Sequence, residues 1–138
     1  RADEVHFMLV SAKVESEIAM LDTEAEKLEF LQDLGITATA LESLTRLCLE
    51  SLNLISFFTV GSDEVRQWLV RKDSRAPQAA GVIHSDLERG FIRAEVFKYD
   101  ELMTAGNEAE LKKNGQIYVE GKDYLVADGD ILNIRFSV

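Results

Sequence analysis

The sequence has few of the residues on which covalent or metal-based stabilisation depends. Its 138 residues include one cysteine, Cys48, and one proline, Pro77. A single cysteine excludes an internal disulfide and a cysteine-based zinc site. The two histidines, His6 and His84, lie far apart in the sequence, so no metal site is expected. With 46% hydrophobic residues, a chain of this length can instead bury a hydrophobic core.

Long apolar runs and an excess of positive charge are also missing. No stretch approaches the roughly 18 apolar residues that cross a bilayer, so we expect no membrane partner. The sequence does not open on a basic segment followed by an apolar one, and we expect a cytoplasmic protein. With 15 Lys and Arg against 25 Asp and Glu, the net charge of −10 argues against general binding to phosphate backbones, and no DNA partner is expected. Because the first residue is Arg1 and not methionine, we expect the chain to be part of a longer protein.

The charge is unevenly distributed along the chain. Residues 1–52 hold 4 basic and 11 acidic side chains, whereas residues 53–138 hold 11 basic and 14 acidic ones. The nearly balanced second part leaves room for a local basic surface. Near Leu52–Leu54 the sequence changes from helical patterns to β-branched and aromatic residues, and we place a domain boundary there.

Two capping boxes indicate a helical hairpin in the first part. Thr23-x-x-Glu26 and Thr39-x-x-Glu42 each predict a helix start, and Gly35 predicts the end of the first helix. Before them, the apolar run Val5–Val10 predicts a strand. The apolar stripe of the hairpin is expected to contact another domain or the sheet that follows.

The second part predicts a mixed sheet. Strands are expected at 54–60 and 65–70 as a hairpin, at 91–97, at 124–126 and at 131–136, with a helix beginning at Pro77. In the third strand, Ile92, Ala94 and Val96 are expected on one side of the sheet. Asp128-Gly129 predicts a tight turn between the last two strands. The order of elements predicts an α+β fold with a helix across one sheet face, the β-grasp (ubiquitin-like) arrangement.

Several strings at the right spacing resemble one known family over essentially the whole chain. They are SFFTVGSDEVR at 56–66, APQAAGVIHSD at 76–86, GFIRAEV at 90–96, EGKDY at 120–124 and DGD at 128–130. These strings resemble the TGS domain of the YchF/Obg-like ATPases, which belong to the Obg-related P-loop GTPase family. The resemblance implies residues 1–14 as the end of a G domain, 15–52 as a helical connection and 53–138 as the TGS domain. It also implies a longer parent protein that favours ATP over GTP, uses Mg²⁺ and associates with ribosomes.

The resemblance implies a nucleotide contact at the start of the chain. Ser11-Ala12-Lys13 matches the last nucleotide-binding motif of the G domain, which touches the base. The sequence contains no G-x-x-x-x-G-K-[ST], and phosphoryl transfer needs such a phosphate cradle. We therefore expect no catalytic residue and no cofactor in this chain alone. The tripeptide by itself is equally consistent with a polar cap at a strand end.

The sequence departs from the family pattern at a few positions. Asp73 stands where glycine is usual after the second strand, and Leu87 stands where phenylalanine is usual. Leu69-Val70 replaces a usual Thr-Ile pair. These departures bear on the turn after the second strand and on the loop at His84.

The second part offers cationic side chains for a structured RNA or the ribosome. The candidates for RNA contact are Arg66, Arg71, Lys72, Arg75, Arg93 and Lys98. Arginine binds phosphates in a bidentate manner, and Trp68 and Phe58 offer stacking faces. The alternative is that Trp68 is a core residue and the charges form a solvated rim.

His84 has two interpretations, and so does the chain. His84 precedes Ser85-Asp86 and has either a functional role in its loop or a helix-end role, hydrogen-bonding the loop or Asp86. The chain is interpreted as a ribosome- or RNA-docking module. The alternatives are a regulatory tail that controls the ATPase activity of the G domain and a β-grasp domain that binds proteins.

Overall fold

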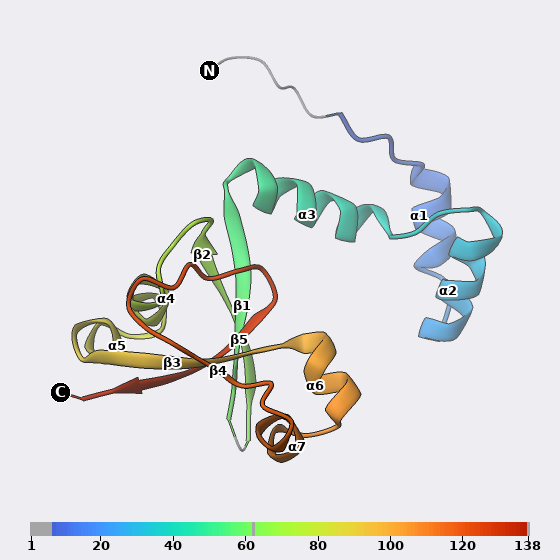
Figure 1. Cartoon of the computed structure of the whole chain (residues 1–138). Helices are drawn as coiled ribbons and strands as arrows, with labels where there is room; N and C mark the ends of the chain where they lie inside the picture. Colours follow the sequence, from blue (N-terminus) through green and yellow to red (C-terminus); the bar gives the residue numbers. More distant parts are fainter. Residues whose placement is uncertain (1–6, 62, 138) are drawn as a thin grey trace. The chain divides into compact units, whose positions relative to one another are not determined.

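The computed structural model describes residues 7–61 and 63–137. Its internal contacts divide the chain into two compact units, Arg1–Ser51 and Leu52–Val138. Figure 1 shows the elements of both units along the chain. The first unit is helical and the second is built on a sheet, so we describe each by itself.

The described part of the helical unit, residues 7–51, holds three helices. They are α1 (Ala12–Ile18), α2 (Glu24–Asp33) and α3 (Ala40–Ser51). In the first turn of α2, the Thr23 hydroxyl accepts from the Glu26 backbone N–H at 3.2 Å, and the Glu26 carboxylate accepts from the Thr23 N–H at 3.0 Å. Thr39 and Glu42 form the same reciprocal pair at the start of α3. Both capping boxes are confirmed, and Gly35 follows α2 with a left-handed φ of +67°.

The start of the helical unit differs from the prediction. Of the expected strand Val5–Val10, residues 5 and 6 lie outside the described residues, and Phe7–Val10 forms no strand. The prediction of a strand is wrong for those four residues because a strand needs a hydrogen-bonded neighbour, and no described strand pairs with this run. Helix α1, which was not predicted, begins directly after it, with the Ser11 hydroxyl accepting from the Val14 N–H at 3.4 Å.

The second unit is a mixed α+β fold around one five-stranded sheet. Its strands are β1 (Leu54–Val60), β2 (Val65–Arg71), β3 (Phe91–Lys98), β4 (Tyr118–Glu120) and β5 (Asp130–Phe136). They lie in the order β2-β1-β5-β3-β4, with β1 and β5 parallel and the other pairs antiparallel. The predicted β1–β2 hairpin is confirmed, in unbroken register along seven residue pairs.

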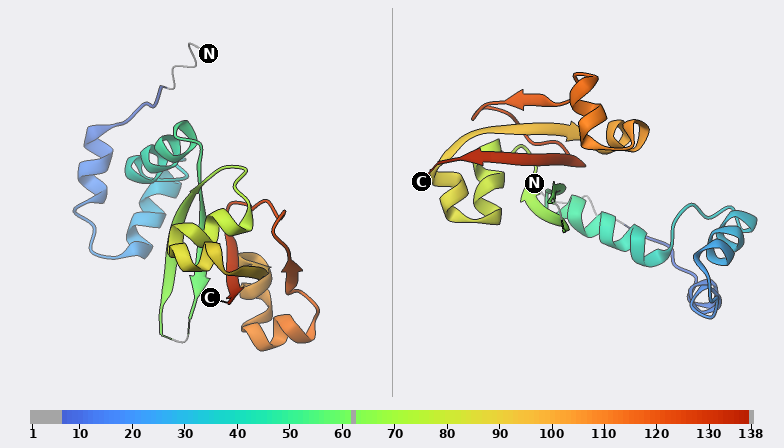
Figure 2. Two further views of the ribbon diagram at one scale, coloured as in Figure 1. Left: turned by 90° about the vertical axis from the view of Figure 1, so that its left-hand side faces the viewer. Right: turned by 90° about the horizontal axis from the view of Figure 1, so that it is seen from below.

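Helices cover parts of both faces of this sheet. They are α4 (Ala76–Ile83), α5 (Ser85–Arg89), α6 (Tyr99–Ala105) and α7 (Glu108–Lys113). A core centred on the fully buried Phe57 and Leu132 joins one face to α4, whose Ala79 and Ala80 are fully buried. A second cluster packs α7, through Leu111, against Phe97 and Ile131. Figure 2 shows α4 and α5 against one face of the sheet.

The last strands of the unit differ from the prediction. Residues 124–126 form no strand, and β4 lies earlier, at Tyr118–Glu120. The Asp128-Gly129 turn exists, with Gly129 at φ +81° and the Asp130 N–H bonded to the Ala127 carbonyl, but it does not join two paired strands. The hairpin prediction is wrong because β5 lies between β1 and β3, so both of its edges are already paired. Residues 124–126 instead run beside 74–76.

A bulge corrects the predicted face of β3. The register between β3 and β5 shifts between Phe91 and Arg93. The shift places Phe91 in the core together with Ala94 and Val96, while Ile92 is 53% exposed. Simple alternation therefore assigned Ile92 to the wrong side. In α4, a Cβ added at Gly81 would meet the carboxylate of Glu88, an exposed and flexible side chain, so this contact does not by itself require glycine.

Candidate nucleic-acid interface

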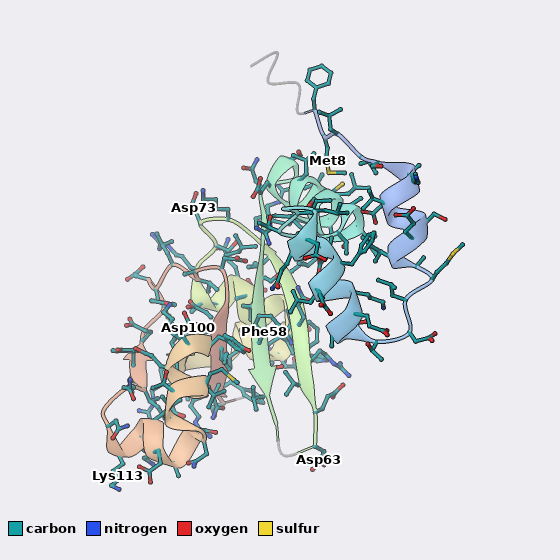
Figure 3. The ribbon with its side chains drawn as sticks, turned by 90° about the vertical axis from the view of Figure 1, so that its right-hand side faces the viewer. Met8, Phe58, Asp63, Asp73, Asp100 and Lys113 are labelled. Atoms are coloured by element: carbon teal, nitrogen blue, oxygen red, sulfur yellow. The ribbon has the colours of Figure 1, made fainter. Side chains whose placement is uncertain are left out.

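The structure separates the candidate cations instead of gathering them into one strip. Arg66 lies near the tip of the β1–β2 hairpin, whereas Arg71 ends β2 at its other end. Figure 3 marks these two ends by Asp63 and Asp73. Because Arg71 is five positions after Arg66, an odd number, their side chains lie on opposite faces of the sheet.

The end of β2 carries a compact group of charges. Arg71 and Lys72 are exposed, and Arg75 is the N-cap residue of α4. The turn between them is formed by Asp73, whose φ of +65° lies in the left-handed region that favours glycine. Aspartate tolerates this left-handed conformation better than most residues, so the departure from the family pattern keeps the turn.

Arg75 forms an ion pair with a neighbouring loop. Its guanidinium donates to the Asp123 carboxylate at 2.8 Å, and the Asp123 side chain is 90% exposed. Among the described residues, Arg71 and Lys72 have no ion-pair partner within 4 Å. At the end of β2, these two side chains are therefore the cations that are available to bind an anionic partner.

Arg66 is held by its own strand. It forms an ion pair with Glu64 at 2.7 Å and lies over the Trp68 ring, 5.4 Å from the ring centroid. The Trp68 indole N–H donates to the Thr59 hydroxyl at 3.0 Å, and its ring packs against the main core. This packing supports the core interpretation of Trp68. Phe58 likewise packs against the second cluster, under α6 and α7.

Arg93 lies beside a charged residue that is distant from it in the sequence. It is exposed on β3 and stands directly opposite Arg135 of β5. Arg135 donates to the Glu95 carboxylate at 3.1 Å, and Asn133 donates to the same group. The sequence analysis missed Arg135, because only the register of the sheet places it beside Arg93.

Lys98 belongs to a buried polar network. Its ammonium is ion-paired with Asp130, which is fully buried. The Asp130 carboxylate also accepts from the Tyr124 hydroxyl at 2.7 Å and from the Ala127 N–H at 2.9 Å. Burial, followed by the hydrogen bond to Asp130, raises the pKa of Tyr124 well above its usual range. The ion pair of Lys98 thus joins the end of β3 to the start of β5, and Asp130 joins both to the loop before β5.

His84 lies where α4 ends and α5 begins. Its Nδ1 accepts from the Asp86 backbone N–H at 3.2 Å and lies 3.7 Å from the Asp86 carboxylate. This is the geometry of a helix-end histidine. Ser85 is the first residue of α5, the helix that His84 caps.

The start of the chain holds the motif assigned to the nucleotide base. Ser11 caps α1, and Ala12 and Lys13 form its first turn, all exposed. The motif therefore has a polar-cap role within this chain, at a helix and not at a strand end. A base contact by these residues stays a prediction.

Residues 7–61 and 63–137 contain neither a membrane-spanning helix nor a metal-binding cluster. No helix there is both long and apolar enough to span a bilayer. No cluster of three or more histidine, cysteine, aspartate or glutamate side chains in the same residues is arranged to hold a metal ion.

Comparison with known proteins places the chain in a family. Residues 54–137 match the family model YchF-GTPase_C, described as a protein of unknown function (DUF933). The chain is 47% identical over 95% of its length to "Ribosome-binding ATPase YchF" of Bacillus subtilis and 42% identical over 88% to "Obg-like ATPase 1" of Gallus gallus. It covers 36% and 31% of these proteins, about a third of their length. The solved structure of the Schizosaccharomyces pombe YchF GTPase matches 91% of the chain at 36% identity with a TM-score of 0.76, and the chain covers 33% of it.

Proposed function

The chain belongs to the YchF-GTPase_C family, and we propose that it is the C-terminal ribosome-docking module of a translation-associated protein that binds ATP or GTP. One observation carries the proposal. The relative from Bacillus subtilis, which shares 47% identity over 95% of this chain, is named a ribosome-binding ATPase. The chain spans only about a third of that protein, so the activity and partners of the whole are inferred.

The sheet unit is the proposed docking domain, with the β-grasp fold of a TGS domain. The strand order with a parallel β1–β5 pair at the centre and α4 across one face supports this assignment. The family match over residues 54–137 and the compact unit Leu52–Val138 support a TGS domain at 53–138. Residues 15–52 are the proposed helical connection, and residues 1–14 the proposed end of the G domain.

The nucleotide and its Mg²⁺ belong to the whole protein in this proposal. A P-loop protein holds the nucleotide phosphates in a glycine-rich cradle, which this sequence does not contain. The residues present do not fit the phosphates or the metal, and no step of hydrolysis is assigned to them. Ser11, Ala12 and Lys13 are proposed to lie at the base when the rest of the G domain is joined to them.

The proposed contact with ribosomal RNA is centred on Arg71 and Lys72. Both are exposed, and both are outside the ion pairs of the described residues, whereas Arg66, Arg75 and Lys98 are each paired with a carboxylate. Binding to an anionic backbone depends on charge that is available to phosphate. Arg75 and Arg93 are placed at the margin of the contact. The protein is proposed to work in the cytoplasm, where its partner is found.

The test is co-sedimentation of the 138-residue chain with ribosomes over a salt series. We expect binding that weakens with salt, and an Arg71→Ala/Lys72→Ala variant with weaker binding and a smaller salt dependence. The matched control is Arg46→Ala/Lys112→Ala, which removes the same charge from exposed positions on α3 and α7. Equal binding by the two variants would remove Arg71 and Lys72 from the contact. Absence of binding at low salt would show that this chain does not dock by itself.

A second function is favoured by the shape of the hairpin tip. A pocket there is lined by Arg66, Trp68, Ile83, Leu87 and Phe136, among others. An apolar floor with a charged rim suits a protein side chain, which supports the alternative of a regulatory tail that contacts protein. Ribosome binding that survives Arg71→Ala/Lys72→Ala but is lost in Leu87→Glu would favour this alternative.

A further inference from the structure

Strand β2 is an unpartnered edge of the sheet. No other described strand pairs with its outer side, and it runs in register with β1 over seven residues. It contains no proline and no bulge. Proteins usually interrupt a long regular edge with one of these features, because an open edge is a template for a further strand.

The backbone groups that face outward follow from the ends of the hairpin. The Gly61 N–H donates to the Glu64 carbonyl at 2.8 Å, and the Lys72 N–H donates to the Asn53 carbonyl at 2.8 Å. Hydrogen-bonded and non-hydrogen-bonded pairs alternate along an antiparallel ladder, and these two bonds are in phase with the register. The residues of β2 whose N–H and C=O groups point away from β1 are therefore Val65, Gln67, Leu69 and Arg71.

The side chains of these residues share one face. Trp68 and Val70 pack into the core on the α4 side, so the residues that alternate with them lie on the opposite face. Val65 is 67% exposed and Leu69 is 42% exposed. The outward edge of β2 thus carries apolar side chains in water together with free hydrogen-bonding groups.

The order of side chains along this edge is self-complementary. From the turn to the end of the strand it is acid, apolar, amide, apolar and base: Asp63, Val65, Gln67, Leu69 and Arg71. We propose that β2 pairs antiparallel with β2 of a second copy of this chain, about a two-fold axis at Gln67. This register places Val65 opposite Leu69, and Asp63 opposite Arg71, twice in each pair of copies.

The rest of the strand agrees with that register. On the α4 side it places Arg66 opposite Trp68 of the second copy, a cation beside an aromatic ring. The Gln67 amide nitrogen already donates to the Ser56 hydroxyl at 2.7 Å, which leaves its carbonyl oxygen and a second N–H for the other Gln67. A two-fold axis at Trp68 would instead place Val65 opposite Arg71 and Gln67 opposite Leu69, apolar against polar.

The pairing is closed and isologous, since both copies use the same edge, the outer side of β2. It does not require ribosome docking, because its partner is the same edge of a second copy, although Arg71 takes part in both proposals. The competing interpretation is that Arg66 and Arg71 only protect the edge against association. The oligomeric state distinguishes the two.

The test is sedimentation velocity of the 138-residue chain over a wide range of concentrations. We expect a monomer–dimer equilibrium, weakened about tenfold by Asp63→Arg and by Arg71→Asp, because each change creates like-charge contacts twice in the dimer. The double variant Asp63→Arg/Arg71→Asp exchanges the charges and restores dimerisation. Asp100→Arg, an equal charge change on α6, is the control and leaves the equilibrium unchanged.

Leu69→Pro provides a test that does not depend on charge. The Leu69 N–H points away from β1 in the derived pattern, so proline leaves the hairpin ladder intact and removes a donor from the outer edge. We expect a folded monomer, with folding checked by circular dichroism. A chain that is monomeric at every concentration, a dimer that the single charge reversals leave intact, or a double variant that stays monomeric would overturn the proposal.

Discussion

The helical unit and the sheet unit are specified by different kinds of interaction. In the described part of the helical unit, only Ile18 and Leu31 are buried hydrophobic residues, and α3 buries none. The sheet unit holds two buried clusters that join residues far apart in the sequence, such as Phe57 and Leu132. The helices are specified by signals within one turn, whereas the sheet is specified by contacts that form only when the chain folds back.

This difference has an energetic meaning. A capping hydrogen bond stabilises a helix by about 1 kcal/mol, whereas a buried aromatic ring stabilises a core by several times that amount. Most of the free energy of unfolding is therefore expected to reside in Leu52–Val138. The following changes test that comparison.

The largest effect is expected in the core of the sheet. Phe57→Ala removes a fully buried ring and is expected to cost about 4 kcal/mol of unfolding free energy. The matched change Leu41→Ala, at a side chain of α3 that is 73% exposed, is expected to cost less than about 0.5 kcal/mol. Urea unfolding measures both, followed by Trp68 fluorescence for the sheet unit and by far-ultraviolet circular dichroism for the helices. Equal costs would contradict the comparison.

The buried network gives the next effect. Asp130→Ala leaves the Tyr124 hydroxyl and the Ala127 N–H without their acceptor, and we expect a loss of about 3 kcal/mol. Asp123→Ala removes an exposed ion pair with Arg75 and is expected to cost less than about 1 kcal/mol. The same urea series measures the difference. A costly Asp123→Ala would show that burial does not decide the strength of these pairs.

A cap in the helical unit should have a smaller and local effect. Thr39→Ala removes the hydroxyl that accepts from the Glu42 N–H, with an expected cost of about 1 kcal/mol to α3. Hydrogen exchange is expected to speed up in α3 and to stay unchanged in β1 and β5. Faster exchange throughout the sheet would show that the units are not independently stable.

The smallest effect appears at alkaline pH. The folded-state pKa of Tyr124 lies above its unfolded value, so the contribution is fully present below about pH 10 and is lost as the pH rises further. We expect the decline to be less than about 1 kcal/mol per pH unit, since the ring is partly exposed to solvent. Tyr124→Phe should show a flatter decline in unfolding experiments between pH 9 and 11. An unchanged slope would assign the alkaline loss to other groups.

The sequence predicted the elements whose signals are local. The capping boxes at Thr23 and Thr39 predicted α2 and α3, and Pro77 predicted α4. The β1–β2 hairpin and the strand at Ile131–Phe136 followed from runs of β-forming residues, and the structure confirms both. Helix α1 was missed, although Ser11 stands at its N-cap, because its residues had been assigned to the end of a strand.

The candidate site was predicted less well than the fold. The sequence singled out Arg66, Arg71 and Lys98 alike as candidates for RNA contact. The structure pairs Arg66 with Glu64 and Lys98 with Asp130, and it places Arg66 and Arg71 at opposite ends of β2. Ion pairing and strand register depend on residues distant in the sequence, such as Lys98 and Asp130, so composition could not separate these cations.

The sequence by itself determined the family, the starts of α2, α3 and α4 and the alternation of the hairpin strands, because each depends on neighbouring residues or on long matching strings. Tertiary structure alone decided three other features. It placed β5 between β1 and β3, which denied residues 124–126 a partner strand. It turned Ile92 outward at a bulge and committed Lys98 to a buried carboxylate. The physical reason is the same in each case: hydrogen-bonding edges and buried charges must be satisfied by whichever segment the fold brings next to them.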